Sequence, residues 1–220
     1  GQPQVEYKEA ITATTDHREV YKKQSGGRGK FADIQFEIGP VEQNEDFKEG
    51  LTFENKIFGG SIPKEFIPSV EKGFKDAMNN GPLAGFGIDS MRVRLFDGSF
   101  HAVDSDQLSF ELAAKMGFRE AAKKAKPVLL EPIMKLEVLT PDEYTGDIVG
   151  DLNRRRGLMQ GMDAKGTGQV IKAKVPLSEM FGYVTDLRTI SSGRATSSME
   201  FDSFQPAPEG VAKKVIEERS

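Results

Sequence analysis

The chain has 220 residues, of which 37% are hydrophobic and 29% are charged, and its formal net charge at pH 7 is −4. This composition is typical of a folded globular protein with one or two domains, and it excludes wholesale disorder. The absence of cysteine excludes disulfides and thiolate chemistry, and two histidines, His17 and His101, are too few for a histidine-rich metal site.

A basic glycine loop, Lys22–Lys30, dominates the start of the chain. It carries four cations, three glycines and no acid. Strands are predicted before it at Val5–Thr12 and after it at Phe31–Ile38, where apolar and polar residues alternate. The loop is therefore predicted to form a hairpin tip, where glycine lets a partner approach the backbone and the cations attract phosphates. An ordinary solvated turn is the alternative that these residue types leave open.

Three further elements are predicted before the middle of the chain. Leu51–Ile57 reads as a strand, and the apolar spacing of Pro63–Met78 predicts a helix, although Pro68 leaves open a start near that residue. Phe86–Phe96 reads as a strand that ends at a turn, Asp97–Ser99. Strands and helices thus mix in this half, as in an α+β domain.

A second helix is predicted to begin at Asp104 or Ser105. With Asp104 as the N-cap, Gln107 completes a capping box three residues later. The last turn of this helix is rich in lysine, which favours the C-terminal end of the helix dipole, and Pro127 follows. We therefore place a domain boundary near Lys126.

The second half of the chain has the predicted order βαββαβ, the split βαβ arrangement of ferredoxin-like domains. Strands are predicted at 133–139, 158–163, 169–175 and 195–204, with helices at 140–156 and 177–190 and a terminal helix at 211–219. The first helix of this half would have Thr140 as its N-cap and would be closed by Gly157.

Motifs for catalysis are weak. A phosphate-binding nucleotide loop fails at Gly29–Lys30, because Phe31 stands where serine or threonine is required. Gly85–Gly87 lacks the third glycine of a dinucleotide-binding turn. His101 stands in a turn and is either an exposed, backbone-bonded residue or a contact residue, and Arg154–Arg156 are either helix-dipole partners or RNA contacts. We therefore expect no enzyme activity from these residues.

Several long stretches, in the same order along the chain, resemble the bacterial elongation factor G family. They are Gly1–Val5, Gln24–Gly29, Gly81–Gly85, Lys126–Pro132, Gly150–Gly157 and Pro176–Tyr183. The resemblance covers essentially the whole chain and corresponds to the fourth and fifth domains of that translational GTPase. The absence of an initiator methionine before Gly1 agrees with a C-terminal fragment.

The resemblance implies an α+β fold with two domains. Residues 1–126 would form an elongated module like domain 2 of ribosomal protein S5, and residues 127–220 would form a ferredoxin-like βαββαβ domain with a C-terminal helix. GTP and Mg²⁺ would be bound by an N-terminal domain that lies upstream, so no cofactor is expected here. The full-length protein would be a GTPase.

The resemblance also implies which residues touch RNA. The contacts with tRNA, mRNA and rRNA at the decoding centre would be made by Gln24, Ser25, Gly26, Gly27, Arg28, Gly29, Lys30 and His101. In the second domain, rRNA-facing positions would be Arg154, Arg155, Arg156, Ser192 and Arg194.

The implied partner is the ribosome, including its rRNA, the tRNA and mRNA it holds, and the proteins of the stalk base. No apolar run approaches the about 20 residues that span a bilayer, so we expect a cytoplasmic monomer without a membrane partner. Translocation of tRNA and mRNA is the expected role. The alternatives are a paralogue specialised in ribosome recycling, a ribosomal protection factor, and a free-standing RNA-binding module.

Overall fold

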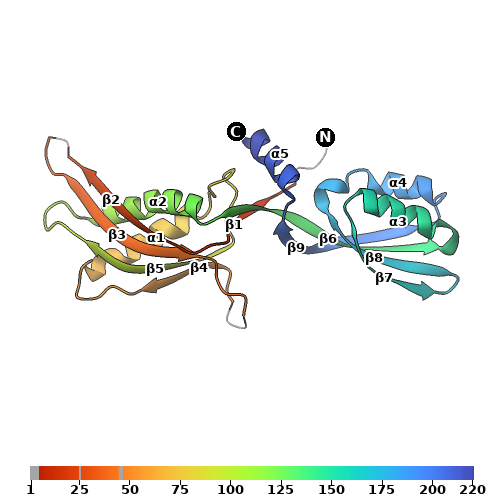
Figure 1. Cartoon of the computed structure of the whole chain (residues 1–220), viewed down its shortest axis with the longest axis horizontal. Helices are drawn as coiled ribbons and strands as arrows, with labels where there is room; N and C mark the ends of the chain where they lie inside the picture. The colour runs from red at the N-terminus through yellow and green to blue at the C-terminus, as the bar shows by residue number, and fades with distance from the viewer. Residues whose placement is uncertain (1–4, 25, 45–46) are drawn as a thin grey trace. The chain divides into compact units, whose positions relative to one another are not determined.

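The computed structural model describes residues 5–24, 26–44 and 47–220, which fold into two compact units (Figure 1). We call Lys8–Leu129 together with Ala207–Ser220 the first unit, and Leu130–Pro206 together with the described residues 5–7 the second unit. The division in mid-chain thus falls after Leu129, near the predicted boundary at Lys126. No helix of the described residues is long and apolar enough to cross a bilayer.

The first unit contains a four-stranded sheet with two helices packed on it. The strand order is β2 (Thr15–Lys23), β3 (Lys30–Gly39), β5 (Ser90–Ser99) and β4 (Gly50–Asn55). The pairs β2–β3 and β3–β5 are antiparallel, whereas β4 runs parallel to β5. Helices α1 (Ile67–Ala77) and α2 (Gln107–Lys124) pack against each other, and α2 also packs on β2 and β3.

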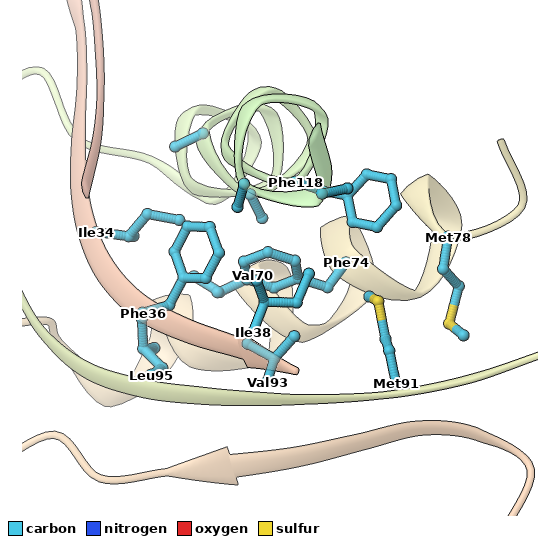
Figure 2. Close-up of a cluster of buried hydrophobic side chains, with 14 of the residues drawn as sticks. Ile34, Phe36, Ile38, Val70, Phe74, Met78, Met91, Val93, Leu95 and Phe118 are labelled. Carbon is cyan, nitrogen blue, oxygen red and sulfur yellow. The ribbon is translucent and has the colours of Figure 1, made fainter. Parts of the chain in front are cut away.

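Alternating residues of β3 and β5 and the inner faces of α1 and α2 form the core of the first unit (Figure 2). Phe36 of β3 meets Phe74 of α1 edge to face, with ring centroids 4.7 Å apart. Gly117 of α2 lies against Phe36, where an added Cβ would come within 2.9 Å of the ring. This close packing fixes α2 on the sheet, and α2 in turn fixes the loop that precedes it.

The strand before the glycine loop differs from the prediction. It is β2, and the predicted strand at Val5–Thr12 shortens to a separate strand, β1 (Lys8–Ile11). Residues of β2 alternate between half-buried and exposed positions, and most of them are polar. Such a strand carries no apolar alternation, so the local pattern did not reveal it. The pairing of Lys23 with Lys30 closes the hairpin that was expected.

The end of β5 and the start of α2 also differ from the prediction. The predicted turn Asp97–Ser99 belongs to β5 and pairs with β3. The helix begins at Gln107, and its N-cap is Asp106, which accepts a hydrogen bond from the N–H of Ser109 at 2.7 Å. Asp104 is therefore not the cap, and it lies in the loop between β5 and α2. The predicted Pro63–Met78 helix consists of a short 3-10 turn, Lys64–Phe66, followed by α1, in agreement with a start near Pro68.

The second unit has the predicted βαββαβ order and a ferredoxin-like sheet. Its elements are β6 (Pro127–Pro141, from Leu130 onward in this unit), α3 (Thr145–Arg154), β7 (Leu158–Lys165), β8 (Gly168–Pro176), α4 (Tyr183–Ile190) and β9 (Thr196–Pro206). The strand order is β9-β6-β8-β7, and each pair is antiparallel. A core that includes Leu136, Ile148 and Ile171 lies between the sheet and the two helices.

Local details of the second unit correct three predictions. Thr140 is not an N-cap but a buried residue of β6, and a 3-10 turn, Asp142–Tyr144, precedes α3. The left-handed residue after α3 is Arg156, with φ of 58°, rather than Gly157. The predicted helix at 177–190 is interrupted by Gly182, whose φ of 76° separates a 3-10 turn from α4.

The C-terminal helix α5 (Glu209–Arg219) groups with the first unit rather than with the ferredoxin-like sheet. Arg219 explains this grouping, because its Nε donates to the carbonyl of Ala84 at 3.1 Å and its guanidinium lies 4.2 Å from the centre of the Phe86 ring. The buried carboxylate of Glu9 holds the same loop by accepting hydrogen bonds from the backbone N–H groups of Leu83, Ala84 and Phe86.

Candidate RNA-binding interface

Two loops meet at one end of the sheet of the first unit, and we call them the tip. They are the described residues of 24–29, between β2 and β3, together with Lys30 at the start of β3, and residues 100–106, between β5 and α2. Backbone groups join them where β3 begins. The N–H of Phe31 donates to the carbonyl of Asp104 at 3.0 Å, and Ser105 Oγ donates to the carbonyl of Phe31 at 2.7 Å.

Two cationic side chains of the first loop reach into the second loop. Arg28 Nε donates to the carbonyl of Val103 at 2.9 Å, and Lys30 Nζ donates to Asp106 Oδ2 at 2.5 Å. The tip is therefore held in one arrangement before a partner binds. Such preorganisation lowers the conformational entropy that binding would cost.

The imidazole of His101 is fixed by its own loop. Its Nδ1 accepts from the N–H groups of Val103 and Asp104, at 3.3 and 3.2 Å, and its backbone N–H donates to Ser105 Oγ at 2.9 Å. An Nδ1 that accepts leaves the proton of the neutral ring on Nε2. The side chain is 57% exposed, so this Nε2–H is available to donate to a phosphate or a ribose hydroxyl.

Arg28 keeps most of its donors free. Only its Nε is bonded to another described residue, and the side chain is exposed. The two terminal nitrogens can therefore bind a phosphate through a planar fork. Gly26 and Gly27 precede it, and both are exposed. An added Cβ at Gly26 would meet no described atom within 4 Å, so a partner could approach the backbone closely there.

The other predicted tip residues have different surroundings. Gln24 is exposed, whereas Gly29 is buried. An added Cβ at Gly29 would lie 3.1 Å from both Asp104 Oδ2 and the carbonyl oxygen of Lys23, so little space remains there for a partner. Lys30 is neutralised by its ion pair with Asp106. Ser25, which was predicted to contact RNA with them, lies outside the described residues.

The ion pair with Lys30 also keeps Asp106, the N-cap of α2, in its ionised form. Burial alone would raise the pKa of Asp106, but hydrogen bonds from Lys30 and from Ser109 outweigh it and lower the pKa to about 2. Asp106 is thus a carboxylate that joins the glycine loop to α2. Sequence analysis did not predict the bonds of Asp106 to Lys30 and of Ser105 to Phe31, because the partners lie 76 and 74 positions apart in the chain.

The three arginines at the end of α3 in the second unit divide into one exposed and two bonded side chains. Arg154 is 76% exposed and makes one hydrogen bond, from Nη2 to Asp151 Oδ1 at 3.0 Å. It lines a shallow pocket of about 340 Å³ that also contains Asp147 and Asp151. These carboxylates lower the affinity of the pocket for phosphate.

Arg155 and Arg156 are used inside the second unit. Arg155 binds Asp151, the carbonyl of Glu179 and Asp186, and it packs on the ring of Tyr183. Arg156 binds both carboxylate oxygens of Glu131, at 2.9 and 3.0 Å. The N–H donors of Arg155 and Arg156 are therefore used in bonds to acceptors of the second unit. Of the three arginines, Arg154 is the most accessible to a partner.

The other two predicted residues, Ser192 and Arg194, lie in the turn between α4 and β9. Ser192 is exposed in the turn after α4, with φ of 53°. Arg194 Nη1 binds Glu143 Oε1 at 2.7 Å, just before the start of α3. Arg154 lies at the opposite end of α3, about 15 Å away for a ten-residue helix. The structure thus does not gather these residues into one cationic patch.

Among the described residues, no three side chains of the types His, Cys, Asp or Glu are grouped so that they could hold a metal ion.

Two family models match the chain, one after the other. The model described as "Elongation factor G, domain IV" matches residues 3–126, and the one described as "Elongation factor G C-terminus" matches residues 128–215.

Curated relatives and a solved structure are similar over nearly the whole chain. Elongation factor G of Cytophaga hutchinsonii is 65% identical over 98% of the chain, and that of Amoebophilus asiaticus is 63% identical over 99%. A crystal structure of a Thermus thermophilus protein matches 99% of the chain with a TM-score of 0.84 and 36% identity. The chain spans about 30% of the length of these two relatives and 32% of that structure's chain.

Proposed function

Because this chain belongs to the elongation factor G family, we propose that it is the C-terminal, ribosome-binding part of a translational GTPase that promotes tRNA–mRNA translocation. The tip would enter the decoding centre, and residues 1–126 and 127–220 would serve as the fourth and fifth domains of the factor. Its partners would be rRNA, tRNA, mRNA and proteins of the stalk base, in the cytoplasm.

The preformed tip is the observation that carries this proposal. His101 and Arg28 come from two loops, and each presents free N–H donors to solvent while its remaining bonds fix the loop. Donors of this kind recognise phosphates and ribose without reading base sequence, which suits a factor that acts on every codon. A rigid tip can occupy the space that tRNA and mRNA vacate and so block their return.

No bond is made or broken by the tip in this mechanism. GTP and Mg²⁺ would be bound by a part of the longer protein outside this chain. Conformational change in that part would move the first unit and its tip, and the tip would convert this movement into directional tRNA displacement.

Single-round translocation by the full-length factor tests the proposal, with wild type and His101→Ala compared. We expect slower tRNA movement in the variant with GTP turnover nearly unchanged. His101→Asn retains an acceptor near the position of Nδ1 but not the ring, so it separates loop support from the Nε2–H contact. Gln107→Ala, an exposed change in the first turn of α2, is the control.

Ribosome splitting with recycling factor is measured on the same proteins. A wild type that splits ribosomes without translocating would instead assign the chain to the recycling paralogue. Removal of a ribosome-bound antibiotic without translocation would assign it to the ribosomal protection factors.

A further inference from the structure

A third loop, residues 56–63 between β4 and α1, presents the most exposed large apolar side chain in the described part of the molecule. Phe58 is 91% exposed. The next two residues, Gly59 and Gly60, both have left-handed backbone conformations, with φ of 67° and 71°, and an added Cβ at either would meet no described atom within 4 Å. An aromatic ring and an open stretch of backbone thus stand together in solvent.

The loop is anchored at both ends, so the position of Phe58 is set by the fold. The N–H of Ile57 donates to Asn55 Oδ1 at 3.0 Å, and the N–H of Lys56 donates to the carbonyl of Leu95 at 2.8 Å. At the other end Ile62 is buried beneath Gly98, where an added Cβ would lie 2.6 Å from Ile62 Cδ1. Anchoring of this kind reduces the entropy lost when the ring is used for binding.

The position of this loop relates it to the tip. Because β4 runs parallel to β5, the loop that leaves β4 lies at the end of β5 that continues into residues 100–106. Figure 1 shows the loop after β4 and the loop between β5 and α2 at the same end of the first unit. The loop that contains Phe58 and the loop that contains His101 therefore lie at the same end of the first unit.

The chemistry of the loop favours a nucleobase as its partner. Residues 57–63 contain no charged side chain, and the exposed Lys56 and Lys64 flank them without an ion pair to any described residue. Along the chain, the charged residue nearest to the ring is the cation Lys56. A protein pocket would be expected to contact an apolar rim, but the residues that follow the ring are two glycines and a serine.

We propose that Phe58 is a stacking platform for an unpaired RNA base, which gives the first unit a third point of contact with RNA beside the two loops of the tip. This inference rests on the proposed ribosomal function. Stacking on an aromatic ring tolerates any base, and the flanking glycines let the sugar–phosphate backbone pass close to the loop.

Variants of Phe58 in the full-length factor test the inference through affinity for ribosomes. Phe58→Ala and Phe58→Leu should both weaken binding by about tenfold, whereas Phe58→Trp should bind as well as wild type or better. Because the ring is in solvent, thermal unfolding of each variant should match wild type. Chemical footprinting should show one base that wild type protects and Phe58→Ala does not.

The variants separate a base from a protein pocket. If Phe58→Leu binds like wild type while Phe58→Ala is weak, an apolar protein site holds the side chain and the inference is wrong. Equal binding by all variants also overturns it, and the proposed function then stands if the wild type translocates and His101→Ala does not. A wild type that fails to bind ribosomes would overturn both.

Discussion

The guanidinium of Arg156 binds the carboxylate of Glu131 through two parallel hydrogen bonds, of 2.9 and 3.0 Å. Glu131 belongs to β6 and its side chain is 3% exposed, so the pair joins the end of α3 to the sheet beneath it. The hydrogen bond with Glu131 is the main cause that raises the pKa of Arg156, and Glu179 adds to it. Arg156 is therefore part of the framework of the second unit.

Arg156→Ala should lower the free energy of unfolding of the second unit by about 3 kcal/mol, because it leaves the buried carboxylate of Glu131 without its partner. Arg154→Ala, two residues away and 76% exposed, should change it by less than about 0.5 kcal/mol. Urea denaturation monitored by circular dichroism measures both. Equal effects of the two substitutions would contradict a structural role for Arg156.

The carboxylate of Asp106 should make the stability of the first unit depend on pH. Its folded pKa of about 2 lies below the ordinary value of 3.8, so the stabilisation is complete above about pH 4 and is lost as the pH falls toward 2. The wild type should therefore exceed Asp106→Asn by about 1–2 kcal/mol at pH 6, and the difference should shrink in that window. Urea denaturation of both proteins from pH 6 to pH 2 measures it.

Asp16→Asn is the control for this pH dependence. Asp16 is exposed on β2, and its carboxylate makes no hydrogen bond or ion pair with a described residue. Its substitution should leave the pH profile parallel to that of wild type. A difference between wild type and Asp106→Asn that stays constant down to pH 2 would show that Asp106 acts as a neutral cap and not as a charged partner of Lys30.

The fold could be predicted where local patterns determine it. Apolar and polar residues alternate in β6 and β8, and Gly166 and Gly193 mark turns between elements. These local patterns were sufficient to predict the βαββαβ order. Strand β2 was missed because one of its faces is solvated and polar, so its pairing with β3 decides its conformation. Propensity along a single segment does not contain that information.

The arrangement of the candidate site depended on contacts between distant segments. The basic loop was recognisable from its residue types, but Arg28 meets Val103 and Lys30 meets Asp106 across about 75 positions of the chain. In the sequence, Arg154, Arg155 and Arg156 likewise cannot be told apart, because all three are cations at the end of one predicted helix. Only the folded structure distinguishes the exposed Arg154 from its two bonded neighbours.

Arg28 offers the most direct test of phosphate binding at the tip. Its terminal nitrogens are bonded to no described residue, so each phosphate they neutralise should release counterions and make association salt-dependent. Arg28→Ala in the full-length factor should weaken ribosome binding and reduce the slope of log affinity against log salt concentration by about 0.7–0.9 for each lost contact.

Arg28→Lys keeps the charge but not the planar fork, so its slope should stay near that of wild type although its affinity falls. Affinities measured at several salt concentrations for the three proteins separate charge from geometry. An unchanged slope in Arg28→Ala would mean that the residue serves only to tie its loop to the carbonyl of Val103, and the RNA contacts of the tip would then rest on His101 and the glycine backbone.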